Sequence, residues 1–150
     1  MKNLTKDLIE LSYEFRCFIH SYNTSLKKPL YDDVVDDVMD KLSKNKFFYI
    51  IYQNKGYLLI SLDVNNKFIT NKTLYICELF VRNQFRNKGI AKSLLSSIIK
   101  IPEFSGIYKI FVDINILNNA ISFYFKNGFV LQSMQLIKTR MGDTNGTERL

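Results

Sequence analysis

The pattern of apolar and polar residues is sharpest over residues 74–102, where a strand, a loop and a helix are predicted in succession. Residues 74–81 are apolar on both alternating faces except at Glu78, which predicts a strand covered on both sides of its sheet. Residues 82–89 are polar and basic and contain one glycine. Apolar residues then recur at helical spacing until Pro102, which has no amide hydrogen and therefore predicts the end of a helix.

The remaining segments alternate between the helical and the strand period. Residues 2–4 predict a short strand, and Thr5 is placed to cap the helix that follows. A second helix is predicted over residues 32–42, and its inner face is made of Val34, Val35, Val38, Met39 and Leu42. A hairpin is predicted at Asn54 and Lys55, between two β-rich runs. The predicted strands outside the central one are residues 46–53, 56–64, 107–114 and 129–137, and the last helix runs from Asn118 or Asn119 to Lys126.

Length and composition are those of one globular domain. The chain has 150 residues, of which 47% are hydrophobic and 14% aromatic, and this argues for a well-filled core and against disorder. We expect a single domain over residues 1–141 and a polar tail over 142–150. No apolar run is long enough to span a membrane, and the N-terminal residues lack the continuous apolar core of a signal peptide, so the cytoplasm is the expected location.

Cysteine, histidine and charge exclude several classes of site. Cys17 and Cys77 lie far apart in apolar surroundings, and we interpret both as small core residues rather than a disulfide or a metal pair. One histidine and no CxxC leave no metal constellation. The net charge of +7 invites nucleic-acid binding, but the basic residues are scattered without a dense stripe, so this partner ranks last. The same charge would attract an anionic cofactor.

The basic loop is a candidate anion site. A helix that begins directly after a loop points its first free N–H groups and the positive end of its dipole into that loop. Arg86, Lys88 and Lys92 add full positive charges, and Gly89 lets the backbone approach a ligand closely. An ordinary solvated β–α connection fits the spacing equally well, since one glycine is a far weaker signal than a full glycine-rich fingerprint.

The segment Arg86-Asn87-Lys88-Gly89-Ile90-Ala91 resembles the R/Q-x-x-G-x-G/A signature of the GNAT family of acetyl-CoA-dependent N-acetyltransferases. As in that family, the segment stands between a strand and a helix. The resemblance implies that the pyrophosphate of coenzyme A is bound by Arg86, Asn87, Lys88, Gly89, Ile90, Ala91 and Lys92. It also implies that Leu79, Phe80 and Val81 pair through their backbone with the pantetheine arm.

The resemblance extends to about Lys138 and implies the fold of the family. That fold is α/β (α+β), with a mixed, mostly antiparallel central sheet of about six or seven strands flanked by about four helices. The family normally ends in two strands, whereas only about one and a half fit before the polar tail. Either residues 129–131 and 134–138 form two short strands, or the last strand is missing or supplied by a partner chain, and an unpaired edge would favour a homodimer.

A second segment, residues 119–129, is similar to the family's N-x-x-A-x-x-x-Y-x-x-x-G-F pattern. Tyr124 falls on the tyrosine that in many members protonates the departing coenzyme A thiolate, and a phenol suits this role because it is protonated at neutral pH. Simple packing of its ring against the sheet is the alternative. An asparagine of the family pattern is replaced by Leu117, so Asn118 or Asn119 is expected to hold the pantetheine instead.

Together these likenesses imply direct attack of a primary amine, from a small molecule or a protein, on acetyl-CoA in a ternary complex without a metal. Glu78, a carboxylate beside the cofactor track, is the candidate general base, and Asp113 is a second candidate. A structural role for Glu78, paired with a lysine or at an open edge, is equally compatible with the sequence. The alternative function is a non-catalytic acyl-CoA-binding or sensing module of the same fold, and the sequence does not identify the acceptor.

Overall fold

The computed structural model describes residues 2–23, 26–63, 72–114 and 120–132. The chain divides into two compact units, Met1–Asp113 and Ile114–Leu150. The helices and strands of the first unit are α1 (Lys2–Tyr22), α2 (Tyr31–Ser43), β1 (Phe47–Tyr52), β2 (Gly56–Asp63), β3 (Lys72–Val81), α3 (Ile90–Ser97) and β4 (Ile107–Val112). Short 3₁₀ helices lie at Gln53–Lys55, Asn83–Phe85, Ile98–Lys100 and Pro102–Phe104. The second unit contains α4 (Ile121–Lys126).

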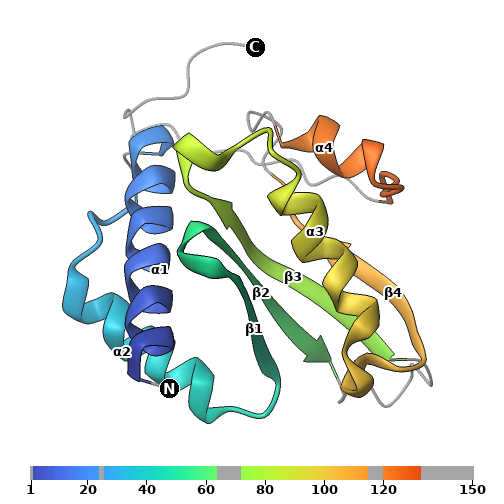
Figure 1. Cartoon of the computed structure of the whole chain (residues 1–150), viewed down its shortest axis with the longest axis horizontal. Helices are drawn as coiled ribbons and strands as arrows, with labels where there is room; N and C mark the ends of the chain where they lie inside the picture. The colour runs from blue at the N-terminus through green and yellow to red at the C-terminus, as the bar shows by residue number, and fades with distance from the viewer. Residues whose placement is uncertain (1, 24–25, 64–71, 115–119, 133–150) are drawn as a thin grey trace, which may run out of the picture. The chain divides into compact units, whose positions relative to one another are not determined.

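The strands of the first unit form one sheet in the order β1-β2-β3-β4 (Figure 1). β1 pairs with β2 and β2 with β3 in antiparallel fashion, whereas β4 joins β3 in parallel. The predicted hairpin is confirmed, with a turn in which Gln53 has a left-handed φ of 49°. The mixed α/β class is therefore confirmed, but the six or seven predicted strands are not, since the described residues contain a four-stranded sheet.

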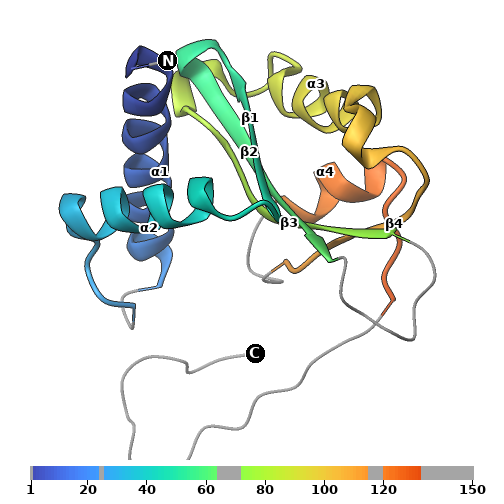
Figure 2. The same ribbon diagram turned by 90° about the horizontal axis from the view of Figure 1, so that it is seen from below.

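Helices of the first unit cover both faces of this sheet. Figure 2 shows α1 and α2 on one face and α3 on the other. The core on the α1–α2 face is formed by Leu8, Leu11, Val34, Val38, Tyr57, Leu59 and Phe80. Leu58 and Ile60 alternate with the buried residues of β2 and are themselves fully buried, on the side where Ile90 and Leu94 of α3 are buried. β2 thus lies between two apolar layers.

The chain begins as a helix and not as the predicted short strand. α1 already includes Lys2, so Thr5 lies inside the helix instead of capping it. Leu8 and Leu11 anchor the helix in the core. Extending an existing helix by a turn costs far less than starting one, and this favours helix over an isolated strand at residues 2–4.

The inner face of α2 is narrower than predicted. Val34 and Val38 are buried, but Met39 and Leu42 are about half exposed. At 3.6 residues per turn, Met39 is rotated away from the stripe through the two valines, and Leu42 lies in the last turn before the helix ends. The prediction that Met39 and Leu42 point inward is therefore wrong.

A β-bulge interrupts β3. Leu59 lies opposite Glu78 and Ile60 lies opposite Ile76, so Cys77 is the extra residue on β3. Cys77 and Tyr75 are exposed. The prediction that Cys77 is a core residue is therefore wrong, and the bulge takes this residue out of the regular ladder. The prediction that β3 is covered on both faces throughout is also wrong, because Tyr75, which precedes the bulge and stacks on Phe111 of β4, is exposed. Cys17 is half-buried, and both cysteines are free.

In the second unit, α4 ends where the sequence predicts. Gly128 has a left-handed φ of 86°, as expected for a glycine that closes a helix. Asn118 and Asn119, at the predicted start of the helix, lie outside the described residues. Residues 129–132 form no strand, and the rest of the strand predicted over 129–137 also lies outside the described residues.

Candidate functional site

The bulge at Cys77 divides β3 into two parts with different neighbours. The first part pairs with both β2 and β4, and its last pair with β4 is Ile76 with Val112. Figure 1 shows the two strands side by side near the start of β3 and apart near its end. Among the described residues, the part from Cys77 to Val81 pairs with β2 alone. Among the described residues, the backbone groups of residues 79–81 that point away from β2 meet no other strand. The Val81 carbonyl accepts a hydrogen bond from Arg86 Nε, and the other groups are open to an extended ligand.

The loop after β3 leaves a run of backbone N–H groups without backbone partners among the described residues. Asn87 and Gly89 have left-handed φ angles of 59° and 77°. α3 begins at Ile90, and its first turn is closed by the Ser93 N–H, which donates to the Gly89 carbonyl at 2.9 Å. In the part of the chain that the structure describes, the N–H groups of residues 87–92 have no backbone acceptor. Successive free N–H groups at left-handed residues and a helix N-terminus form a concave site for an anion.

Open space lies above this loop. A β-carbon built at Gly89 meets no atom within 4 Å, so the glycine is required by its backbone angle and not by crowding. Lys88, whose ammonium lies 5.6 Å from the centre of the Phe85 ring, and Lys92 are both exposed. The loop can therefore receive a phosphate group from solvent.

Arg86 is held at the base of the loop. Its Nε donates to the Val81 carbonyl at 3.0 Å, and its guanidinium carbon lies 4.5 Å from the centre of the Phe18 ring of α1. The cation–π contact and the hydrogen bond fix the orientation of the guanidinium. The sequence predicts the charge of Arg86 at this place but not its support by α1.

Arg82 has a role that the sequence pattern does not reveal. Its Nε and Nη2 donate to the carboxylate of Glu14 on α1 at 2.8 to 3.1 Å, and its Nη1 donates to the Asn54 carbonyl at 2.7 Å. Its backbone N–H donates to the Lys55 carbonyl. Arg82 therefore ties the start of the loop to α1 and to the β1–β2 turn, and its guanidinium is committed to these contacts.

Glu78 lies on the α1–α2 face of the sheet, opposite Leu59, and its side chain is 12% exposed. The Tyr57 hydroxyl donates to Glu78 Oε2 at 2.5 Å. The other oxygen, Oε1, lies 3.5 Å from Arg16 Nη2 and 4.0 Å from Lys41 Nζ. The pairing with a lysine that the sequence leaves open is therefore present, together with two partners that it does not predict.

The cations beside Glu78 also bind Asp37 of α2. Arg16 Nη2 and Lys41 Nζ each lie 2.5 Å from Asp37 Oδ2. Burial alone would raise the pKa of Asp37, but the hydrogen bond and charge of Lys41, followed by those of Arg16, outweigh burial and lower it. In the sequence Asp37 is one of several aspartates on α2, and only the fold distinguishes it from the others.

Two tyrosines complete this cluster. Tyr57 is fully buried, and burial, then the charge of Glu78 and their hydrogen bond, raise the pKa of Tyr57 well above its ordinary value. Burial, followed by the charges of Glu78 and Asp37, also raises the pKa of Tyr49 on β1. The Tyr49 hydroxyl has no hydrogen-bond partner among the described residues. Both phenols therefore remain protonated at neutral pH. The strand period marks both as sheet residues but gives no signal of their proximity to Glu78.

Tyr124 lies in α4 of the second unit and is 6% exposed. The rings of Phe123 and Phe129 approach it edge-on, with centroids 5.3 Å and 5.2 Å away. Burial raises the pKa of Tyr124 to about 12, so its hydroxyl carries a proton at neutral pH. The two asparagines predicted to hold pantetheine, Asn118 and Asn119, lie outside the described residues.

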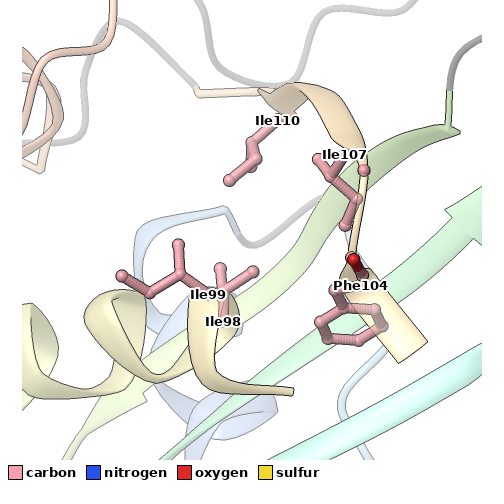
Figure 3. A pocket seen from close by; sticks show the side chains of 7 residues that line it. Ile98, Ile99, Phe104, Ile107 and Ile110 are labelled. Carbon is pink, nitrogen blue, oxygen red and sulfur yellow. The ribbon is translucent and has the colours of Figure 1, made fainter. Parts of the chain in front are cut away.

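A cavity of about 330 Å³ lies beyond the C-terminal end of α3. Figure 3 shows that it is surrounded by the apolar side chains of Ile98, Ile99, Phe104, Ile107 and Ile110. None of the predicted site residues lines this cavity.

The described residues contain no group of three or more His, Cys, Asp or Glu side chains placed to hold a metal ion. No helix in the same part of the chain has the length and apolar character needed to cross a membrane.

Comparison with known proteins identifies this arrangement. The family described as the acetyltransferase (GNAT) domain matches residues 44–131, which is more than half of the chain. The match includes β1 to β4, the loop with its free N–H groups, and α4.

Solved structures share the fold across nearly the whole chain. A putative acetyl transferase from Pyrococcus furiosus has a TM-score of 0.65 at 20% identity, and the alignment covers 89% of this chain and 93% of that one. A possible acetyltransferase from Clostridium difficile 630 has a TM-score of 0.70 at 17% identity, with 91% and 92% covered. An aminoglycoside acetyltransferase from an uncultured soil metagenomic sample has a TM-score of 0.68 at 19% identity, with 92% and 91% covered.

The chain therefore belongs to the GNAT family and is an acetyltransferase of the N-acetyltransferase type. The resemblance noted in residues 86–91 and 119–129 is confirmed at the level of the family.

Proposed function

We propose that this enzyme transfers the acetyl group of acetyl-CoA to a primary amine, by direct attack within a ternary complex. The observation that carries the proposal is the run of backbone N–H groups from Asn87 to Lys92 that lacks acceptors in the described part of the chain. Two left-handed residues and a helix N-terminus concentrate these donors at one place. A pyrophosphate is the ligand that such a site favours.

The residues of the loop and of β3 fit coenzyme A. Arg86, Lys88 and Lys92 supply positive charge beside the free N–H groups, and the space above Gly89 is open. The open edge of residues 79–81 can pair with the amide groups of an extended pantetheine arm, in the manner of an added strand. When bound, acetyl-CoA supplies an acetyl group activated as a thioester.

Two side chains of the enzyme would then accept and donate the protons of the reaction. Glu78, which directly follows the bulge on β3, accepts the proton that the attacking amine loses as its nitrogen bonds to the acetyl carbon. Tyr124, kept protonated by burial, donates a proton to the sulfur as the carbon–sulfur bond breaks. A backbone N–H of residues 79–81 polarises the thioester carbonyl.

The acceptor is proposed only as a primary amine. One structural relative is by name an aminoglycoside acetyltransferase, and aminoglycosides therefore belong in an acceptor panel with polyamines and lysine-containing peptides. The structure favours none of them over the others.

Calorimetric titration with acetyl-CoA tests the donor. We expect binding by the wild-type protein, and Arg86→Ala should weaken it about tenfold or more through the loss of a charge-assisted contact. Gly89→Val should also weaken binding, because a β-branched residue opposes the φ of 77°. Lys100→Ala removes a positive charge outside the loop and should bind like the wild type. Absence of binding by a folded wild-type protein would refute the proposal.

Turnover over the amine panel tests the reaction. Tyr124→Phe should lower kcat by about a hundredfold or more while leaving the affinity for acetyl-CoA unchanged. Tight binding of acetyl-CoA without turnover of any amine would instead support the acyl-CoA-sensing module.

A further inference from the structure

We propose that Tyr57 is a positioning residue for Glu78: its hydroxyl, with Arg16 and Lys41 on the opposite oxygen, holds the carboxylate in one orientation. The inference rests on the proposed function, in which Glu78 accepts the proton of the amine. Tyr57 does not touch the reacting atoms and acts only through Glu78.

The contact distances single out Tyr57 among the partners of Glu78. Its hydroxyl lies 2.5 Å from Oε2, whereas the nearest cations lie 3.5 Å and 4.0 Å from Oε1. Arg16 and Lys41 both lie 2.5 Å from Asp37, so the shorter contact of each cation is with that aspartate. Because Coulomb attraction falls with distance, the cations favour the ionised carboxylate of Glu78 but constrain its geometry less than the phenol does.

The fold holds the phenol rigidly in place. The Tyr57 side chain is fully buried, and it contacts the rings of Phe15, Tyr49 and Phe80 with centroids 6.2 to 6.3 Å away. Tyr57 is also paired with Phe80 across the β2–β3 ladder, two residues from Glu78. A ring locked on every side leaves only the hydroxyl hydrogen free to rotate, so the donor comes to the carboxylate at low entropic cost.

The direction of this hydrogen bond is fixed by charge. Tyr57 remains protonated, as described above, so the phenol donates and the carboxylate accepts. The titratable or charged groups that face Glu78 are Arg16 of α1, Asp37 and Lys41 of α2, Tyr49 of β1 and Tyr57 of β2, with Cys77 preceding it on β3. Of these, Tyr57 is the neutral donor that the structure places on Oε2.

The pH profile of kcat/KM tests this role with a matched pair of variants. Tyr57→Phe removes the hydroxyl and keeps the ring, and the ionised carboxylate loses its donor. The acidic limb should move to higher pH by about one to two units, and kcat should fall. Tyr49→Phe removes a neighbouring buried hydroxyl that has no hydrogen-bond partner among the described residues, and it should leave the limb in place. An unmoved limb in Tyr57→Phe would overturn the proposal.

A second pair of variants, at Arg16, keeps the test possible if Tyr57→Phe does not fold. Arg16→Gln should move the acidic limb in the same direction, and Arg16→Lys should restore part of the shift because it returns a positive charge near Oε1. If Arg16→Gln moves the limb and Tyr57→Phe does not, the cations orient Glu78 and the role of Tyr57 is rejected.

A readout without turnover separates this inference from the proposed function. The ¹³C carboxyl resonance of Glu78 should titrate at higher pH in Tyr57→Phe than in the wild type or Tyr49→Phe, whether or not an amine substrate is known. If the resonance moves and the kinetic limb does not, the hydrogen bond exists but Glu78 is not the general base. The positioning role of Tyr57 is then rejected, and acetyl transfer remains as proposed. If the resonance also stays in place, the hydrogen bond itself is rejected. A wild type without turnover refutes the proposed function and with it the positioning role in catalysis, whereas the resonance then decides only whether the hydrogen bond exists.

Discussion

Gly56 brings β2 directly against the backbone of β3. A β-carbon at this position would lie 2.6 Å from the Phe80 carbonyl oxygen and 3.2 Å from Val81 Cγ2. The first distance is too short for any real contact, so a larger residue must displace the backbone of one strand. Because Phe80 and Val81 belong to the open edge proposed for pantetheine, such a displacement would reach the cofactor site.

We expect Gly56→Ala to lower the free energy of unfolding by about 1–3 kcal/mol, the usual cost of overpacking. The affinity for acetyl-CoA should fall as well. Urea denaturation and calorimetry measure the two effects. Ser61→Ala, on the same strand, places no new atom and should change either quantity little. A Gly56→Ala protein of unchanged stability would show that the two strands separate more easily than the structure indicates.

At the scale of single residues, the sequence predicts those whose role depends on near neighbours in the chain. The loop of residues 86–91 is recognisable because its glycine, its charges and the following helix are contiguous. The left-handed conformation of Asn87 is not evident in this way. Glu78 stands out as the charge in an apolar strand, but its contact with Tyr57 depends on the register of β2 against β3 and on the bulge.

At the scale of elements, α1 supports the loop at two points. Glu14 and Phe18 lie four residues apart and hence on one face of the helix. Glu14 accepts hydrogen bonds from Arg82 at the start of the loop, and the ring of Phe18 packs against the guanidinium of Arg86. The first helix therefore helps to hold the loop that forms the candidate anion site.

A double-mutant cycle on Glu14 and Arg82 tests this support. Glu14→Gln and Arg82→Gln should each destabilise the protein, with a coupling energy of about 1 kcal/mol, because the bidentate geometry is good but Glu14 is 43% exposed. Each single variant should also weaken acetyl-CoA binding. The Lys6–Glu10 pair of the same helix, at 3.9 Å and well exposed, is the control and should show almost no coupling. Equal coupling in the two pairs would argue against a special role for Arg82.

Helices and the hairpin are predictable because their signals are local. α3, α4 and the β1–β2 turn follow from periodicity, a proline or a glycine within a few residues. The start of α1 and the bulge are not predictable in this way. The first is decided by packing of Leu8 and Leu11 in the core, and the second by pairing with a strand that lies elsewhere in the sequence.

At the scale of the first unit as a whole, the ionic cluster connects the two helices α1 and α2 with the sheet. Arg16 comes from α1, Asp37 and Lys41 come from α2, and Glu78 comes from the sheet. The pKa of Asp37 is lower in the folded protein than its ordinary value. Its ionised form therefore contributes stability above the ordinary pKa of an aspartate, and this contribution is lost as pH falls through the lowered value.

The pH dependence of thermal unfolding tests the contribution of Asp37. The Tm of the wild type should fall as pH decreases below about 4, and Asp37→Asn should reduce that slope because the titrating group is gone. Asp40→Asn, on the exposed side of the same helix, should retain the slope of the wild type. A slope in Asp37→Asn equal to that of the wild type would mean that other carboxylates govern acid unfolding.

The composition of the whole sheet is the feature that the sequence predicts least well. The class of fold is correct, since alternation of strand and helix patterns already restricts the layers. The number of strands predicted from the resemblance exceeds the four described. Part of the predicted last strand, residues 133–137, lies outside the described residues.

The extra residue in β3 has a consequence for insertions and deletions. Deleting Cys77 would leave a regular ladder, because Ile76 already lies opposite Ile60 and Glu78 already lies opposite Leu59. Glu78 would keep its place beside Tyr57, and Phe80 would stay in the core on the α1–α2 face. Deletion at Cys77 should therefore be tolerated better than deletion of a paired residue of the strand, which changes the register. Among homologous chains, differences in the length of this strand should fall at the bulge.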